Sequence, residues 1–356
     1  MKKTALIMAG GRGERFWPRS RVNMPKQFLS LTDDGKTLIQ QTVERMLPLL
    51  DIEDVFIATN RRYKKLVMEQ LPELPEENIL CEPASKNTAP CIGLGAIHIA
   101  KKYDDAVMFV LPSDHLITHP QIFRRMLRDA AHTAEEGPNL VTIGITPTYP
   151  ETGYGYIKFD PEAAYGAAFA VDSFVEKPDL DTARKYVQSQ QYLWNSGMFT
   201  WRVSTILDNL KTFMPDTYEG LMRIGEAIGT EEQDEVLERE FNAFKSESID
   251  YGIMEKAKNI YILIGAFGWD DVGSWLAVER FRERNEFGNV VTGNVVMVDT
   301  KNTLIQGTKK LIAAVGLENL IIIDTDDALL VCDKSSTGDI KKVLENLRIC
   351  ERTEYL

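Results

Sequence analysis

The feature that most constrains the fold is an alternation of short apolar runs and helical segments over the first 145 residues. The apolar runs, long enough for buried strands, occupy residues 4–9, 55–59, 107–111 and 140–145. Segments with helical spacing occupy residues 37–50, 62–71, 88–102 and 123–136. This alternation predicts a mostly parallel sheet with helices on both faces, in which ligands bind beyond the carboxyl ends of the strands.

The rest of the chain predicts a charged helical segment and a β-rich tail. Residues 171–201 mix strand and helix patterns, and residues 217–244 are helical and highly charged, as expected of a solvated insertion. After Asn285 the sequence becomes β-rich, and residues 338–347 again have helical spacing. We therefore predict an α/β domain over residues 1–286 and a small β-rich domain, ending in a helix, over residues 287–356.

Composition excludes several classes of protein. With 41 Lys and Arg against 53 Asp and Glu, the net charge of −12 argues against general nucleic-acid binding. The four cysteines form no C-x-x-C pair, so a zinc site is not expected. The apolar run at residues 4–9 is too short for a signal peptide, and no run approaches the roughly 20 residues of a membrane span. These features predict a cytoplasmic protein without membrane or nucleic-acid partners.

A glycine-rich turn follows the first predicted strand. Gly10, Gly11 and Gly13 would let the backbone approach a phosphate closely, and Arg15 and Lys26 add positive charge beside the turn. The spacing fits neither the dinucleotide-binding pattern nor a P-loop. An ordinary glycine turn would explain the glycines alone, but not the accompanying Arg15, Pro18 and Pro25-Lys26.

Carboxylates stand at two places where they could hold a metal ion. Asp114 comes directly after the predicted strand at residues 107–111, and Asp270 and Asp271 lie among glycine and tryptophan residues. Hard oxygen ligands of this kind suit Mg²⁺. Each aspartate, taken alone, could instead cap a turn or a helix.

Two further motifs carry groups suited to a sugar. Glu176 and Lys177 end a strand-like run, and neighbouring residues on a strand point to opposite faces. Asn195 offers both donors and acceptors, as sugar hydroxyls require, and Gly197 permits close approach. Surface charges and a polar turn are the plain alternatives for these motifs.

In this order, the motifs closely resemble those of the nucleotidyltransferase family that activates sugar 1-phosphates. The resemblance covers about residues 4–280 and is narrower for the guanylyl branch, mainly through residues 82–90. It rests on residues 16–28 (FWPRSRVNMPKQF), Glu82-Pro83 with residues 87–90 (NTAP), residues 112–115 (PSDH), 153–157 (GYGYI), 174–178 (FVEKP), 194–199 (WNSGMF) and 271–275 (DVGSW).

The resemblance implies a Rossmann-like nucleotidyltransferase domain with a small, left-handed β-helix-like C-terminal domain, and GTP and mannose 1-phosphate as substrates. Arg15 and Lys26 would bind the β- and γ-phosphates, and Lys177 would bind the phosphate of the sugar. The implied nucleotide-binding residues are Gly10, Gly11, Gly13, Glu82, Asn87, Thr88 and Ser113. The implied sugar-binding residues are Gly155, Glu176, Asn195 and Gly197. Mg²⁺ would be held by Asp114 and Asp271, while Asp270 stands where the family usually has a small residue.

Three alternatives remain beside this interpretation. The same reaction with another sugar 1-phosphate and nucleoside triphosphate is the nearest, and a non-catalytic nucleotide-sugar sensor is the second. A nicotinamide-dependent dehydrogenase is disfavoured by the position of the third glycine. The resemblance also implies a homodimer, and because the chain ends at Leu356 we expect none of the isomerase activity that longer family members carry.

Overall fold

The computed structural model describes residues 1–11 and 13–356, so Arg12 of the glycine-rich turn lies outside the described residues. The chain forms two compact units. Unit 1 comprises Met1–Gly10, Thr42–Ser113 and Ile117–Trp269, and unit 2 comprises Gly11–Gln41, Asp114–Leu116 and Asp270–Leu356. Helix α1 (Leu38–Met46) and the short strands β5 (Leu116–Ile117) and β11 (Trp269–Asp270) lie where the chain passes from one unit to the other. The division into domains at residue 286 stays a prediction.

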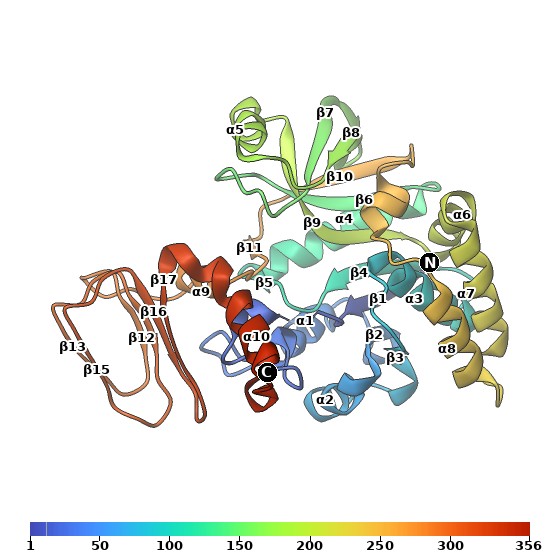
Figure 1. Cartoon of the computed structure of the whole chain (residues 1–356). Coiled ribbons are helices and arrows are strands. Elements are labelled where there is room, and N and C mark those ends of the chain that lie inside the picture. Colours follow the sequence, from blue (N-terminus) through green and yellow to red (C-terminus); the bar gives the residue numbers. More distant parts are fainter. Residues whose placement is uncertain (12) are drawn as a thin grey trace. The chain divides into compact units, whose positions relative to one another are not determined.

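Unit 1 is built on a mixed sheet, shown in Figure 1. In the described residues, its strands follow the order β3 (Ile79–Glu82), β2 (Val55–Asn60), β1 (Lys2–Met8), β4 (Ala106–Pro112), β9 (Tyr192–Arg202), β6 (Leu140–Ile145), β10 (Ile260–Gly265), β8 (Ala168–Val175) and β7 (Tyr156–Tyr165). Strands β3 to β4 run parallel, as the alternating pattern predicts. Strand β9 then runs antiparallel to both β4 and β6.

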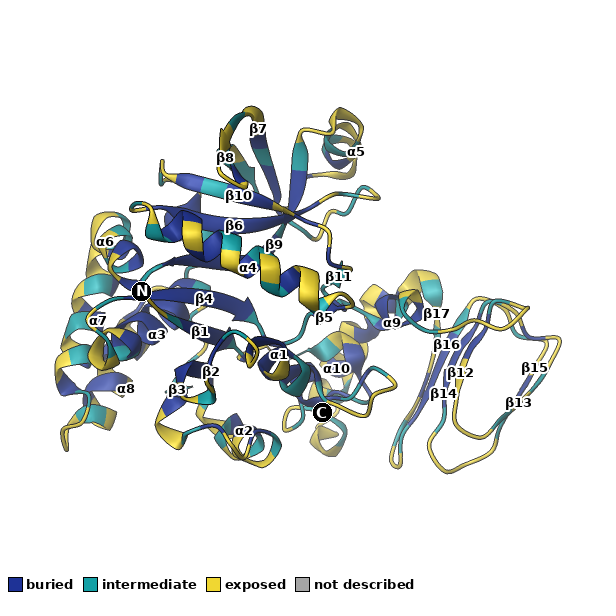
Figure 2. Cartoon of the chain, turned by 180° about the vertical axis from the view of Figure 1, so that it is seen from behind, coloured by how far each residue is buried: buried dark blue, intermediate teal, exposed yellow. Residues whose placement is uncertain are grey.

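Helices cover both faces of this sheet, which confirms the α/β prediction. Successive residues of a strand face opposite ways, and Leu140 and Val141 of β6 belong to different core clusters. Leu140 lies in the cluster that contains α3 (Thr88–Lys102), whereas Val141 packs with Ala130 and Ala134 of α4 (Pro120–Glu135). Figure 2 shows the exposed stripe of α4 on its outer side. Helices α2 (Lys64–Gln70) and α5 (Leu180–Ser189) complete the unit together with α6 (Val203–Phe213), α7 (Pro215–Ala227) and α8 (Gln233–Ala243).

The charged segment at residues 217–244 is not the solvated insertion that its composition predicts. It forms α7 and α8, whose Leu221, Ile224 and Phe241 are at most 1% exposed and belong to the same cluster as α3. The charges occupy the outer faces of these helices, so an amphipathic pattern was concealed by a high overall charge.

Unit 2 holds the C-terminal strands and the N-terminal segment that follows the glycine-rich turn. Parallel strands β12 (Val290–Thr292), β14 (Leu304–Gln306) and β16 (Leu320–Asp324) stack in register, with β17 (Leu329–Asp333) antiparallel at the edge. A second parallel pair is formed by β13 (Val295–Val298) and β15 (Ile312–Val315). Helix α9 (Trp275–Arg280) precedes these strands and α10 (Ile340–Ile349) follows them.

The β-rich run at residues 290–298 is two strands because the backbone turns a corner at Gly293. Its φ is 96°, in the left-handed region that favours glycine, and a Cβ there would lie 2.6 Å from the carbonyl oxygen of Gly307.

The Trp17 indole donates to the carbonyl of Tyr355 at 2.8 Å, which ties the N-terminal segment to the end of the chain. No helix of the described residues is long and apolar enough to cross a bilayer.

Candidate active site

Lys26 joins the predicted site residues of unit 2 through the hydrogen bonds of its ammonium group. It begins a short 3-10 turn after Pro25, and its side chain is 6% exposed. The Lys26 Nζ donates to Asp114 Oδ2 at 2.8 Å and to the backbone carbonyl of Asp271 at 2.6 Å. The structure therefore brings together three residues that the sequence places far apart.

The glycine-rich turn packs directly on this lysine. Gly13 has a φ of 60°, and a Cβ at that position would overlap the Lys26 side chain. Gln27 Nε2 donates to the carbonyl of Gly11 at 3.1 Å, which holds the turn from its other side. Arg15 itself is exposed and lies on a 3-10 turn (Glu14–Phe16), and its neighbour Glu14 is paired with Arg348 at 2.7 Å.

The two adjacent aspartates have different surroundings. The Asp270 carboxylate accepts from Arg280 Nε at 2.6 Å and Nη2 at 2.8 Å, so its charge is matched by a bidentate partner. Asp271 Oδ1 accepts from the Gly273 N–H at 3.1 Å, while its carbonyl binds Lys26. The backbone carbonyl of Asp271 therefore shares the Lys26 ammonium with the carboxylate of Asp114, and the assignment of Asp271 as the metal ligand stays a prediction.

The acidic residues of unit 2 fit a divalent cation in the chemistry of their oxygens. Burial alone would raise the pKa of Asp114, but the Lys26 ammonium and His115 lower it below its ordinary value, so the carboxylate is ionised. Asp114 and Asp271 already converge on one positive charge, the Lys26 ammonium. Within residues 1–11 and 13–356, no group of three or more His, Cys, Asp or Glu side chains is arranged to hold a metal ion.

In unit 1, four of the predicted sugar-binding residues meet. A Cβ at Gly155 would overlap Glu176 Oε1, so the glycine is needed for this close approach. Asn195 Oδ1 accepts from the Gly197 N–H at 3.1 Å, and Gly197 has a φ of 68°. These contacts fix the orientation of the Asn195 amide and leave Nδ2 as its donor.

The expectation that Glu176 and Lys177 point to opposite faces is wrong. Strand β8 ends at Val175, and Lys177 has a φ of 44°, so the alternation of a strand no longer applies. Lys177 Nζ consequently lies 3.2 Å from Glu176 Oε2, with the lysine side chain 63% exposed.

Asp250 is a residue of this cluster that the sequence reasoning missed. Its Oδ1 accepts from Asn195 Nδ2 at 2.7 Å. Burial and the neighbouring Glu176 carboxylate raise the pKa of Asp250 to about 6. The sequence does offer one signal for Asp250: it is the only carboxylate in the run from Ile249 to Met254, beside apolar residues. An acid buried in such a run needs a polar partner.

Four of the predicted nucleotide-binding residues, Glu82, Asn87, Thr88 and Ser113, also lie in unit 1. Glu82 ends β3 and is 6% exposed, and a Cβ at Gly10 would lie 3.3 Å from its Oε2. Burial raises the pKa of Glu82 to about 7. Asn87 caps α3 by accepting from the Thr88 N–H at 2.8 Å, and Ser113 follows β4 at 2% exposure.

The segment at residues 247–250 contacts both the start of α3 and the cluster of predicted sugar-binding residues in unit 1. The Ile249 N–H donates to Thr88 Oγ1 at 2.8 Å, and the Ala89 N–H donates to the carbonyl of Glu247 at 3.1 Å. The next residue along this segment is Asp250, which holds Asn195. The helix start beside Glu82 and the sugar cluster are therefore connected through residues 247–250.

The chain is similar to proteins of known families over nearly its whole length. Residues 4–286 match the Nucleotidyl transferase family, and residues 293–347 match the MannoseP isomerase/GMP-like beta-helix domain. The chain is 39% identical to a mannose-1-phosphate guanylyltransferase of Salmonella montevideo, covering 99% of this chain and 75% of that protein. It is 40% identical to the enzyme of that name from Escherichia coli (strain K12), covering 98% and 74%. A crystal structure described as mannose-1-phosphate geranyltransferase from Thermus thermophilus has a TM-score of 0.89 and 34% identity, covering 98% of this chain and 100% of that one.

The raised pKa of Glu82 predicts a pH-dependent effect on stability. Because the folded-state pKa of about 7 exceeds the ordinary 4.5, the stabilisation linked to the bound proton is complete below pH 4.5 and lost as pH rises through 7. Glu82→Gln mimics the protonated form, so it should raise the free energy of unfolding by about 3 kcal/mol at about pH 8 and by little at about pH 4. Urea denaturation at both pH values, with the exposed Glu73→Gln as control, measures this. An equal effect of Glu82→Gln at the two pH values would contradict it.

Proposed function

Because the chain belongs to the nucleotidyl transferase family, we propose that it transfers GMP from GTP to α-D-mannose 1-phosphate, giving GDP-mannose and pyrophosphate. The observation that carries this proposal is the similarity to guanylyltransferases over nearly the whole chain, at 39–40% identity. The clusters around Lys26, Glu82 and Asn195 supply the groups that such a reaction requires.

Unit 1 contributes recognition of the base and of the sugar. An ionised Glu82 can accept the two N–H groups on the Watson–Crick edge of guanine, which uracil and thymine lack in that pattern. Asn87 and Thr88 at the start of α3 and Ser113 after β4 complete the proposed nucleotide-binding residues of this unit. Glu176, Asn195 and Asp250 offer oxygen and nitrogen atoms to mannose hydroxyls, and Gly155 and Gly197 keep the approach open. Lys177 would bind the phosphate of the sugar.

Unit 2 contributes binding of the phosphates. Gly11 and Gly13 would direct backbone N–H groups at the triphosphate, and Arg15 and Lys26 would neutralise the β- and γ-phosphates as pyrophosphate leaves. Asp114 and Asp271 are the residues that would hold a divalent cation, which we propose to be Mg²⁺. Such an ion supplies further positive charge to the phosphates and helps to orient them.

The reaction requires little proton transfer. A phosphate oxygen of mannose 1-phosphate is already anionic near neutral pH, so it can attack the α-phosphorus of GTP without a general base. One P–O bond forms as the bond to the β-phosphate oxygen breaks in line, and the electron pair leaves with pyrophosphate. The residues act by positioning the two polyanions and by neutralising their charge.

Four cysteines without a disulfide are consistent with a reducing compartment, so we propose a cytoplasmic location.

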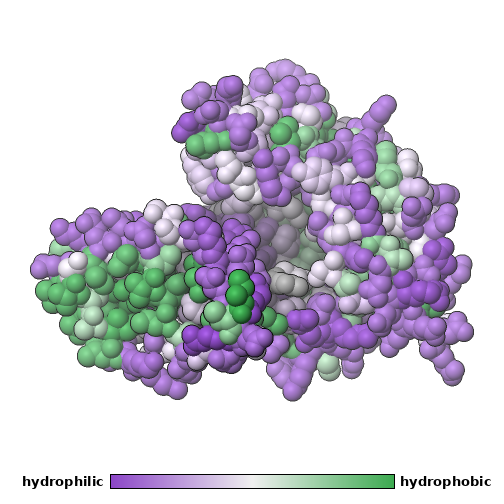
Figure 3. Space-filling view, in the orientation of Figure 1, coloured by the Kyte–Doolittle hydropathy of each residue, from purple (hydrophilic) through white to green (hydrophobic). Residues whose placement is uncertain are grey.

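We also propose that the chain forms a homodimer through the apolar surface of its C-terminal strands. This surface, green in Figure 3, includes Val296, Val298, Leu311 and Val315, which are 52–65% exposed. Contiguous exposed apolar side chains commonly mark a protein interface.

Measuring pyrophosphate release over a grid of four nucleoside triphosphates and three sugar 1-phosphates tests the proposed reaction. Mannose, glucose and N-acetylglucosamine 1-phosphates would be the three acceptors, each with Mg²⁺. We expect strong release only for GTP with mannose 1-phosphate. Release with a different pair would replace the proposed substrates. No release from folded protein that still binds nucleotide would favour a nucleotide-sugar sensor.

The contrast between the two aspartates predicts unequal effects of substitution. Asp271→Asn should lower kcat by about 100- to 1,000-fold and raise the Mg²⁺ concentration needed for half-maximal rate, because a ligand charge is lost. Asp270→Asn weakens the pair with Arg280 while its Oδ1 can still accept from the Val272 N–H, so kcat should stay within about tenfold of the wild type. Steady-state kinetics at several Mg²⁺ concentrations distinguish the two. A greater loss in Asp270→Asn would reverse the assignment.

The proposed dimer can be tested by charging its interface. Val298 and Val315 are neighbours on β13 and β15, so the double variant Val298→Asp/Val315→Asp places two carboxylates in the apolar surface. Light scattering should show a dimer for the wild type and a monomer for this variant, because the charges would need to be desolvated. Ile122→Asp, at an apolar side chain that is 47% exposed on α4, is the matched control and should stay dimeric. A wild-type monomer would exclude the proposal.

A further inference from the structure

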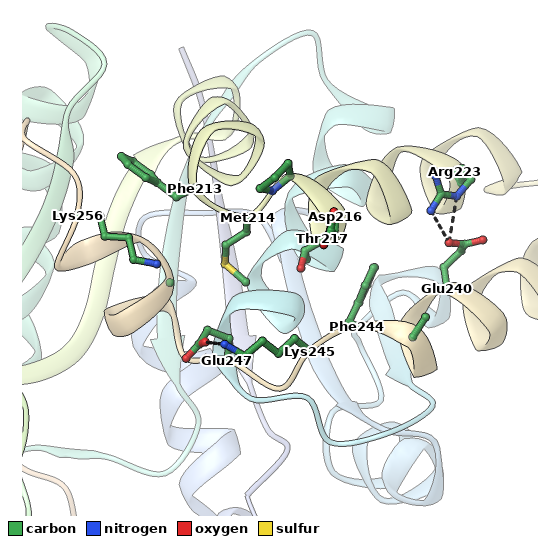
Figure 4. Close-up of a pocket in the computed structure, with 13 residues that line it drawn as sticks. Phe213, Met214, Asp216, Thr217, Arg223, Glu240, Phe244, Lys245, Glu247 and Lys256 are labelled. Carbon is green, nitrogen blue, oxygen red and sulfur yellow. Dashed lines mark hydrogen bonds and ion pairs between the residues drawn. The ribbon is translucent and has the colours of Figure 1, made fainter.

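Unit 1 contains a cavity of about 440 Å³ that none of the proposed active-site residues lines. Its walls are the junction of α6 and α7, the end of α8 and the segment from Ala243 to Lys256, as Figure 4 shows. A volume of this size lies within the range of pockets that bind small molecules, about 300–1,000 Å³.

One wall of this cavity provides donors for an anion. Helix α7 begins at Pro215, which has no N–H, and it lacks a side-chain cap. The Tyr218 N–H donates to the Met214 carbonyl at 3.0 Å, so the N–H groups of Asp216 and Thr217 are the ones available in the first turn. Thr217, in that first turn, is 4% exposed, and its hydroxyl has no hydrogen-bond partner among the described residues. Lys256 also lines the cavity, on the other side of Met214 from Thr217, and it has no ion pair within the described part of the chain.

Most of the carboxylates in the lining are already neutralised. Arg223 donates to Glu240 Oε2 from Nε at 3.0 Å and from Nη2 at 2.8 Å, and Arg239 pairs with its other oxygen. Lys245 Nζ lies 2.7 Å from Glu247 Oε2. The exposed Asp216 is the remaining acid of the lining, so its repulsion favours a ligand of low total charge over a polyphosphate.

The rest of the cavity is apolar. Phe213, Met214 and Phe244 line it, and Phe244 is 6% exposed. Gly252 lies against Met214, since a Cβ there would come within 2.7 Å of the Met214 Sδ. An occupant therefore needs a flat or aliphatic body as well as an anionic group.

We propose that this cavity binds a small organic oxyanion, such as an aryl phosphate. Its charged group would lie at the start of α7, bound by the Thr217 hydroxyl, while Lys256, on the other side of Met214, would attract it at longer range. Its apolar body would lie against Met214 and Phe244. The site is separate from the substrate-binding residues, and its existence does not depend on which nucleotide sugar the protein makes.

Phenyl phosphate is a suitable probe of this site. Titration calorimetry in the presence of saturating GDP-mannose, which blocks the substrate-binding residues, should give a Kd of about 1 mM for the wild type. Thr217→Val, which removes only the hydroxyl, should weaken binding about tenfold, and Lys256→Met, which removes a more distant charge, should weaken it about threefold. Thr217→Ser keeps the hydroxyl and should retain wild-type affinity. Phenol, which has no charged group, should not bind.

Matched controls distinguish this site from general attraction of anions. Lys258→Met removes an exposed lysine two positions away and should leave the affinity within about twofold of the wild type. A crystal soaked in phenyl phosphate should show its phosphorus beside Thr217 Oγ1. Binding that Thr217→Val leaves unchanged, or density for the probe only at the substrate-binding residues, would overturn the proposal. So would the absence of heat in the wild type.

Discussion

The contact on which unit 2 depends is that of one buried ammonium group. This unit is assembled from three separate stretches of chain, residues 11–41, 114–116 and 270–356. Lys26 belongs to the first, Asp114 to the second and Asp271 to the third, and the Lys26 Nζ binds the other two within 2.8 Å. A buried charge that loses its partner typically costs about 3–5 kcal/mol, so this contact favours one arrangement of the three stretches over others. The same lysine is the cation that the proposed chemistry uses.

Much of unit 1 was predictable from the sequence because its first strands are parallel and buried on both faces. Such strands are continuous apolar runs, and β1, β2, β4 and β6 were all found from that signal. Strand β3 was missed because only four residues, Ile79–Glu82, form it after a turn. The antiparallel position of β9 between β4 and β6 was also beyond local patterns, since strand order depends on contacts between distant segments.

Site residues could be predicted from the sequence where a characteristic residue type follows a strand. Residues whose role depends on packing in the folded protein were harder to predict. Gly13 and Lys26 were recognised as parts of one motif, and the structure adds that one packs on the other. The ion pair of Asp270 with Arg280, ten residues further along, could not be predicted from local sequence patterns. Asp250 was missed because its importance arises from burial beside Asn195, and burial is a property of the fold.

The segment at residues 247–250 has a consequence for how specificity can evolve. Its carbonyl and N–H groups hold the start of α3 beside Glu82, and its last residue holds the amide of Asn195. Four consecutive residues span about 13 Å at most, so the positions of the two recognition elements are coupled through a short stretch of backbone. With Asn195 binding the sugar and Glu82 the base, as proposed, a mutation that reshapes this stretch to accept a new sugar would also disturb the fit of the base. Lineages that change one substrate would therefore tend to need compensating changes for the other.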